Sequence, residues 1–168
     1  MLDIARQYQD NIQFAFKPHP RLFTELCNHS LWGKEKADEY YNRWRDGANT
    51  QLETGPFVAL FKGSDAMIHD SGSFTAEYQF TGKPAMFTTR DMTESEKTLN
   101  ALGKAALQVH YPGKCREDII TFLESVVLKG EDPMQAVRQD FKEKFLTSPG
   151  GKSTADNIHR EVVSSIFG

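Results

Sequence analysis

The segment from residue 66 to residue 89 limits the possible folds of this chain more than any other part of the sequence. A short apolar run, 66–68, leads into a polar loop, and residues 74–80 then suit a helix that ends at Gly82. A Lys-Pro pair breaks the chain before the next apolar run, 85–89. Strand, loop, helix and strand with short connections predict parallel strands joined by crossover helices, and ligands of such sheets bind in loops at the carboxyl ends of the strands.

Comparable patterns occur along the rest of the chain, whose 168 residues are in the size range of one domain with a buried core. Apolar and β-prone runs predict further strands at 12–16 and 50–53. Amphipathic patterns bounded by turn residues predict helices at 22–27, 34–45, 57–61, 94–107, 116–129, 133–145 and 153–167. The sequence therefore predicts a single α/β domain over residues 1–168, a three-layer Rossmann-like parallel sheet with a helical C-terminal tail.

The charges and the cysteines argue against several classes of protein. Twenty Lys and Arg residues stand against 23 Asp and Glu, so the chain lacks the large basic surface that nucleic-acid binding needs. Cys27 and Cys115 are far apart in sequence and have no Cys or His at ligand spacing, which predicts free thiols and no metal site. The polar N-terminus and the lack of a long apolar stretch predict a cytoplasmic protein without a signal peptide or a transmembrane segment.

The tetrapeptide Lys17–Pro20 is the first candidate for a functional site. It follows the strand expected at 12–16, and the prolines on both sides of His19 hold the backbone extended. An imidazole fixed in this way at the end of a strand is suited to donating a hydrogen bond to a phosphate oxygen. The same tetrapeptide also works as a plain strand terminator, so this reading stays open.

The loop Asp70–Ser73 is the second candidate, because it lies between an expected strand and an expected helix. Unpaired backbone N–H groups at the helix start, the hydroxyls of Ser71 and Ser73, and close approach at Gly72 together form a generic phosphate-binding arrangement. Glu77 follows one helical turn later, where a carboxylate can accept both hydroxyls of a ribose. The alternatives are a serine that only caps the helix and an ordinary exposed acid.

Other polar and aromatic residues are expected to be structural. Three histidines have no partner at ligand or catalytic spacing and are expected at the surface: His29, His110 and His159. Three aromatic residues at helical spacing are expected to pack in the core rather than to stack on a ligand: Tyr40, Tyr41 and Trp44.

Taken in order, four stretches resemble the CDP-glycerol:poly(glycerophosphate) glycerophosphotransferases of teichoic acid biosynthesis. They are 16–20, 64–74, Glu77 and 81–87, which lie within about residues 12–90. In that family a strand ends in a His-Pro pair, a segment "SD-x-x-I-x-D-Y-S-S" opens a helix that carries an acid, and a Gly-Lys-Pro strand follows. The resemblance implies a GT-B glycosyltransferase architecture, with this chain as the C-terminal half that binds the donor nucleotide.

The resemblance also implies roles for individual residues. His19 would contact the donor diphosphate and act as the catalytic residue, and Glu77 would bind the ribose. The serine loop would bind the same diphosphate through Ser71, Gly72 and Ser73. Lys17 and Asp70 would support the loops. Two positions depart from the family pattern, since Ser71 stands where the family has tyrosine and Gly72 replaces the first serine of its pair.

The function implied is transfer of glycerol phosphate from a nucleotide-diphosphate donor, CDP-glycerol or a related one, to a cell-wall or capsular polymer or a lipid-linked acceptor. No cofactor is expected. The acceptor would bind an N-terminal domain outside these 168 residues, so the domain alone is expected to bind donor without efficient turnover, and the whole enzyme to lie peripherally at the inner face of the membrane. Two alternatives stay open: a UDP-sugar epimerase or hexosyltransferase of the GT-B fold, and a non-catalytic nucleotide-binding or interaction domain.

Overall fold

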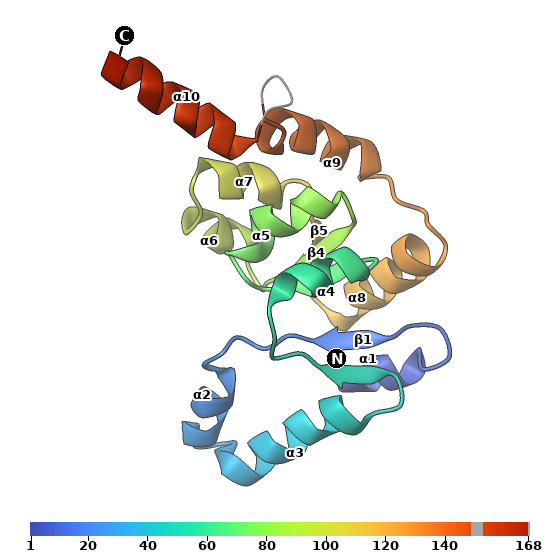
Figure 1. Cartoon of the computed structure of the whole chain (residues 1–168). Helices are drawn as coiled ribbons and strands as arrows, with labels where there is room; N and C mark the ends of the chain where they lie inside the picture. Colours follow the sequence, from blue (N-terminus) through green and yellow to red (C-terminus); the bar gives the residue numbers. More distant parts are fainter. Residues whose placement is uncertain (149–152, 168) are drawn as a thin grey trace. The chain divides into compact units, whose positions relative to one another are not determined.

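The computed structural model describes residues 1–148 and 153–167 of the chain. The chain divides into two compact units, Met1–Gly63 and Ser64–Gly168. Every strand pair in the described residues is parallel, as Figure 1 shows for each unit. The expected α/β class with parallel strands is therefore confirmed, and these strands form two small sheets, one of two strands and one of three.

The first unit holds the two-stranded sheet. Its elements are α1 (Leu2–Gln7), β1 (Phe14–Phe16), α2 (Leu22–Asn28), α3 (Gly33–Asp46), β2 (Thr50–Leu52) and α4 (Phe57–Gly63). β1 and β2 pair in register, with Phe14 opposite Thr50 and Phe16 opposite Leu52. Between the two strands the chain passes through α2 and α3, which pack against each other. The structure confirms the elements that the sequence predicts here, at 12–16, 22–27, 34–45, 50–53 and 57–61.

Aromatic side chains form the core of the first unit. Phe16 of β1 stacks on Trp44 of α3 with ring centroids 4.8 Å apart, and it meets Tyr40 and Tyr41 edge-on. Trp44 is 3% exposed, and Tyr41 is also buried. Each such aromatic pair adds roughly 0.5–1.5 kcal/mol beyond the burial of its surface. The expectation that this aromatic group packs in the core is confirmed.

The second unit holds the three-stranded sheet, in the order β3-β4-β5. Its elements are β3 (Met67–His69), α5 (Phe74–Glu77), η1 (Tyr78–Thr81), β4 (Ala85–Thr88), α6 (Met92–Lys97), α7 (Ala101–Leu107), β5 (Tyr111–Gly113), α8 (Arg116–Thr121), η2 (Phe122–Leu128), α9 (Gln135–Phe141), η3 (Lys142–Leu146) and α10 (Thr154–Phe167). Successive crossovers of the same hand between parallel strands place their helices on one face of a sheet. α5 and α7 accordingly pack against each other (Figure 1).

The helix ends in this unit follow from local residue chemistry. Gly82 closes the turn after η1 with φ of 71°, a left-handed conformation that glycine adopts without strain, and this confirms the expected cap. The helices expected at 116–129 and 133–145 both begin as α-helices. Each continues in a wider π-helical turn, η2 and η3 respectively.

In the second unit the sequence analysis has one helix wrong and misses one strand. The helix expected at 94–107 is two helices, because the side chain of Asn100 accepts a hydrogen bond from the Gly103 backbone N–H (2.8 Å) and starts α7 as a new helix. The strand β5 was not expected, since its residues include Pro112 and Gly113, which are poor strand formers. Proline is tolerated there because β5 pairs only with β4 and so lies at an edge of the described sheet.

Within residues 1–148 and 153–167, no helix has the length and apolar character needed to cross a membrane. Cys27 and Cys115 are both free cysteines.

Candidate functional site

The carboxyl edge of the three-stranded sheet brings three loops together. The hydroxyl of Thr88 donates to the carbonyl oxygen of His69 (3.1 Å), which joins the ends of β4 and β3. The backbone N–H of Thr89 donates to the carbonyl oxygen of Gly113 (3.0 Å), which joins the ends of β4 and β5. The loops that leave this edge are Asp70–Ser73 after β3, 89–91 after β4 and 114–115 after β5. Such an edge is where open parallel sheets bind their ligands.

The serine loop presents polar groups that its own helix does not use. Ser73 holds the N-cap position of α5, but its side chain makes no capping hydrogen bond, and its backbone is helical with φ of −65° and ψ of −39°. The plain helix-cap explanation for this serine is therefore not what the structure shows. The carbonyl oxygen of Ser71 accepts hydrogen bonds from the Thr75 hydroxyl and from Nδ1 of His69, both at 3.1 Å. The loop is thus held from inside while Gly72 and Ser73 are exposed.

Neither backbone conformation nor packing requires a glycine at position 72. Gly72 does not have positive φ, and a Cβ atom there would meet Leu99 Cδ2 at 3.5 Å, an ordinary van der Waals distance. Glu77 ends α5, and its carboxylate is exposed four residues after Ser73.

Two cations at this edge were missed from the sequence. Arg90 follows β4, is exposed, and has no ion-pair partner among the described residues. Lys114 follows β5 and is exposed, and its backbone N–H donates to the Asp118 carboxylate (2.8 Å). A basic residue one or two positions after a strand is the signal that identifies them. For Lys114 that signal depends on recognising β5, whose own residues give no strand pattern.

A pair of histidines lies behind the serine loop. The expectation that His110 is a surface residue is wrong, because it is only 3% exposed and lies edge-on to His69 with ring centroids 5.1 Å apart. Nδ1 of His110 donates to the Ala106 carbonyl oxygen (2.8 Å), and Nε2 accepts from the Gln79 amide (3.3 Å). Burial lowers the pKa of His110 to about 4, and burial together with the neighbouring His110 lowers the pKa of His69 to about 3.

Beside this pair, a buried ion pair links α9 to the segment that precedes it. Arg138, which is 1% exposed, pairs with Asp132, and the Tyr111 hydroxyl donates to the same carboxylate (2.7 Å). Burial opposes ionisation of Asp132, but the hydrogen bonds from Arg138 and Tyr111 outweigh it and keep the pKa of this carboxyl below its usual value. Burial and the same carboxylate raise the pKa of Tyr111 to about 12. We therefore assign these side chains a structural role, since they bond to one another and Arg138 is almost fully buried.

The remaining candidate residues, His19 and Lys17, lie in the first unit beyond the carboxyl end of β1. Nζ of Lys17 donates to the Gly55 carbonyl oxygen (2.6 Å), so it ties the segment after β1 to the segment after β2. His19 is exposed, and its Nδ1 accepts the Arg21 backbone N–H (3.2 Å). Nε2 therefore carries the ring proton and is the donor that faces solvent. That His19 and Ser73 lie within reach of one diphosphate stays a prediction, because the two residues belong to different units.

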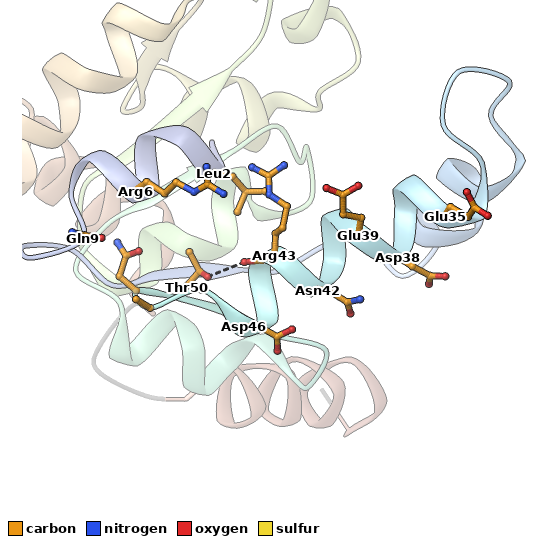
Figure 2. A pocket seen from close by; sticks show the side chains of 13 residues that line it. Leu2, Arg6, Gln9, Glu35, Asp38, Glu39, Asn42, Arg43, Asp46 and Thr50 are labelled. Carbon is orange, nitrogen blue, oxygen red and sulfur yellow. Dashed lines mark hydrogen bonds between the residues drawn. The ribbon is translucent and has the colours of Figure 1, made fainter.

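The first unit also has an open groove of about 910 Å³. Figure 2 shows that the groove runs along α3 and α1. Its lining also includes Thr50, the first residue of β2. Its two arginines, Arg6 and Arg43, each lie within about 4.0 Å of the Asp3 carboxylate. Four acidic side chains also line it: Glu35, Asp38, Glu39 and Asp46. None of the expected site residues is among the lining residues, and the acidic surround does not favour a phosphorylated ligand.

Comparison with known proteins gives no further guide to this site, since no family model, curated protein or solved structure matches the chain. In the described residues, no group of three or more His, Cys, Asp and Glu side chains is arranged to hold a metal ion.

Proposed function

We propose that this chain binds the nucleotide-diphosphate donor of a CDP-glycerol glycerophosphotransferase-like enzyme, as the donor half of a GT-B transferase. The observation that carries the proposal is the unused hydroxyl of Ser73 at the carboxyl edge of a parallel sheet. A serine at an N-cap position that does not cap its helix has its hydroxyl available for a ligand. The neighbouring Gly72 is exposed, as is Ser73, so a ligand in solution can reach the loop.

Two cations at this edge can contact the same ligand. Arg90 and Lys114 follow β4 and β5 at the edge from which the serine loop also leaves, where the acidic side chains are Asp70, Asp91 and Asp118. A diphosphate needs cations and hydrogen-bond donors together, and charge-assisted hydrogen bonds are about twice as strong as neutral ones. Exposed Glu77 is then in place for the ribose hydroxyls at the other end of such a ligand.

In the reaction we propose, a hydroxyl oxygen of the acceptor attacks the β-phosphorus of the donor. A bond forms from that oxygen to phosphorus, and the bond from phosphorus to the bridging oxygen breaks. The hydroxyl proton passes to a base on the acceptor side, and CMP leaves with the bridging oxygen. The serine loop stabilises the negative charge that develops on the bridging oxygen as CMP leaves, and the family resemblance implies that the Nε2–H of His19, which faces solvent, is a further donor to the donor phosphates.

The test is calorimetric titration of the full chain with CDP, UDP and inorganic pyrophosphate. We expect CDP to bind, and Ser73→Ala to weaken it by about 5-fold to 150-fold, because a hydrogen bond to a charged phosphate contributes roughly 1–3 kcal/mol. Arg90→Ala should weaken binding and also make it less sensitive to salt. Ser164→Ala is the control, because its hydroxyl bonds only to the Glu161 carbonyl oxygen within α10.

The second candidate is a UDP-sugar epimerase or hexosyltransferase, which the Asp-Ser-Gly sequence of the loop favours. The same titration separates the two, since this alternative requires UDP to bind more tightly than CDP. If neither nucleotide nor pyrophosphate binds, the chain is an interaction domain and the donor-site proposal fails.

A further inference from the structure

His69 is a polar residue that neither the motifs nor the proposed chemistry uses. It ends β3, and its ring meets Phe87 and His110 edge-on, with centroids 5.3 and 5.1 Å away. Nε2 of the ring is buried and has no hydrogen-bond partner in the described part of the chain. A histidine set among rings in this way has a fixed orientation, and only its Nδ1 atom makes a directed contact.

That contact is with the serine loop. The carbonyl oxygen of Ser71 can only accept, so the Nδ1 atom of His69 must carry the proton of their 3.1 Å hydrogen bond. The buried hydroxyl of Thr75 donates to the same oxygen, also at 3.1 Å. Two donors on one carbonyl oxygen leave its direction little freedom.

The direction of this carbonyl decides where the next N–H group points. The Ser71 carbonyl and the Gly72 N–H belong to one planar trans peptide, in which C=O and N–H point in opposite directions. With the oxygen held inward by His69 and Thr75, the Gly72 N–H points outward from the loop. No hydrogen bond to another described residue uses this N–H group.

We propose that His69 is a positioning residue that aims the Gly72 N–H at the diphosphate of the bound nucleotide. The inference rests on the proposed function for its ligand, and it assigns a role to a residue outside the serine motif. The backbone donor then joins the Ser73 hydroxyl on the same anion. Its orientation is set before the ligand arrives, so binding does not have to order this peptide.

The test compares His69→Asn with His69→Gln. The side-chain nitrogen of asparagine takes the position of Nδ1 and keeps the donor, whereas glutamine moves the donor one carbon further out. We expect His69→Asn to bind CDP within about 2-fold of wild type and His69→Gln to bind about 5-fold to 10-fold more weakly. Thr75→Val, which removes the second donor at nearly constant volume, should weaken binding in the same direction. Ser164→Ala is the control, since its exposed hydroxyl donates to the Glu161 carbonyl oxygen within α10 and touches neither His69 nor the serine loop.

A second readout does not need the nucleotide. The ¹⁵N heteronuclear NOE of the Gly72 amide should stay high in wild type and His69→Asn and fall in His69→Gln, because the peptide loses its anchor. Equal CDP affinity and equal NOE values in the two variants overturn the inference. If wild type binds no nucleotide, the proposed function fails first, and an NOE that differs between the variants then shows that His69 orients the loop without serving a nucleotide.

Discussion

Glu77 gives the sharpest test of the ligand at the scale of single residues. Its exposed carboxylate lies one turn beyond Ser73, and a carboxylate at that position accepts hydrogen bonds from the ribose hydroxyls. We expect Glu77→Ala to weaken CDP binding by about 5-fold or more. The loss should be smaller for 2′-deoxy-CDP, because that ligand already lacks one of the two hydroxyls. Calorimetric titration of both proteins with both ligands measures this difference.

A variant that only loosened α5 would lower the affinity for both ligands by the same factor. Equal losses therefore remove Glu77 from the site. Because the comparison is made within one variant, it does not depend on how much the substitution destabilises the short helix α5 (Phe74–Glu77).

At the scale of elements, the break between α6 and α7 can be tested through Asn100. Its side chain caps α7 by accepting from the Gly103 N–H, and replacing such a cap by alanine costs about 1 kcal/mol. In one continuous helix the same substitution would stabilise the chain, because alanine is the better helix former. We expect Asn100→Ala to lower the urea midpoint and Asn100→Asp to keep it. A raised midpoint for the alanine variant would mean that the helix runs unbroken through position 100.

At the scale of the whole molecule, the lowered pKa values of two histidines make the stability of the second unit depend on pH. The pKa values of His69 and His110 are lowered from 6.5 to about 3 and about 4. Between pH 6.5 and these values the unfolded chain binds protons that the folded chain does not, so stability falls on acidification, by at most about 1.4 kcal/mol per pH unit for each imidazole. Asp132 has its pKa lowered from 3.8, so its contribution is lost only at lower pH.

This pH dependence should appear in one unit. Both tryptophans, Trp32 and Trp44, lie in the first unit, and His69 and His110 lie in the second. We expect the urea unfolding curve from far-UV circular dichroism, which reports both units, to begin at lower urea at pH 4.5 than at pH 7. The curve from tryptophan fluorescence should move less. Equal shifts of the two curves would mean that the units unfold together, and the double variant His69→Asn, His110→Asn should reduce the shift.

Some of this protein was determined by sequence alone, because the signals are local. Apolar runs beside turn residues placed most of the strands and helices, and Gly82 marked a helix end through its own backbone freedom. The serine loop Asp70–Ser73 was likewise identified from its place between a strand and a helix. What these signals share is that each depends on residues a few positions apart.

Other features were decided only by the tertiary structure, because they depend on partners far along the chain. β5 has no strand pattern, and it exists because β4 offers it backbone hydrogen bonds. His110 was expected at the surface, yet it is buried, with the Gln79 amide as a polar partner, and Arg138 is buried because Asp132 supplies an ion-pair partner that offsets the loss of water. The orientation of the serine loop belongs here too, since it depends on a hydrogen bond from a ring that is held by neighbouring strands. Burial and register are properties of the packed molecule, and short-range sequence patterns do not contain them.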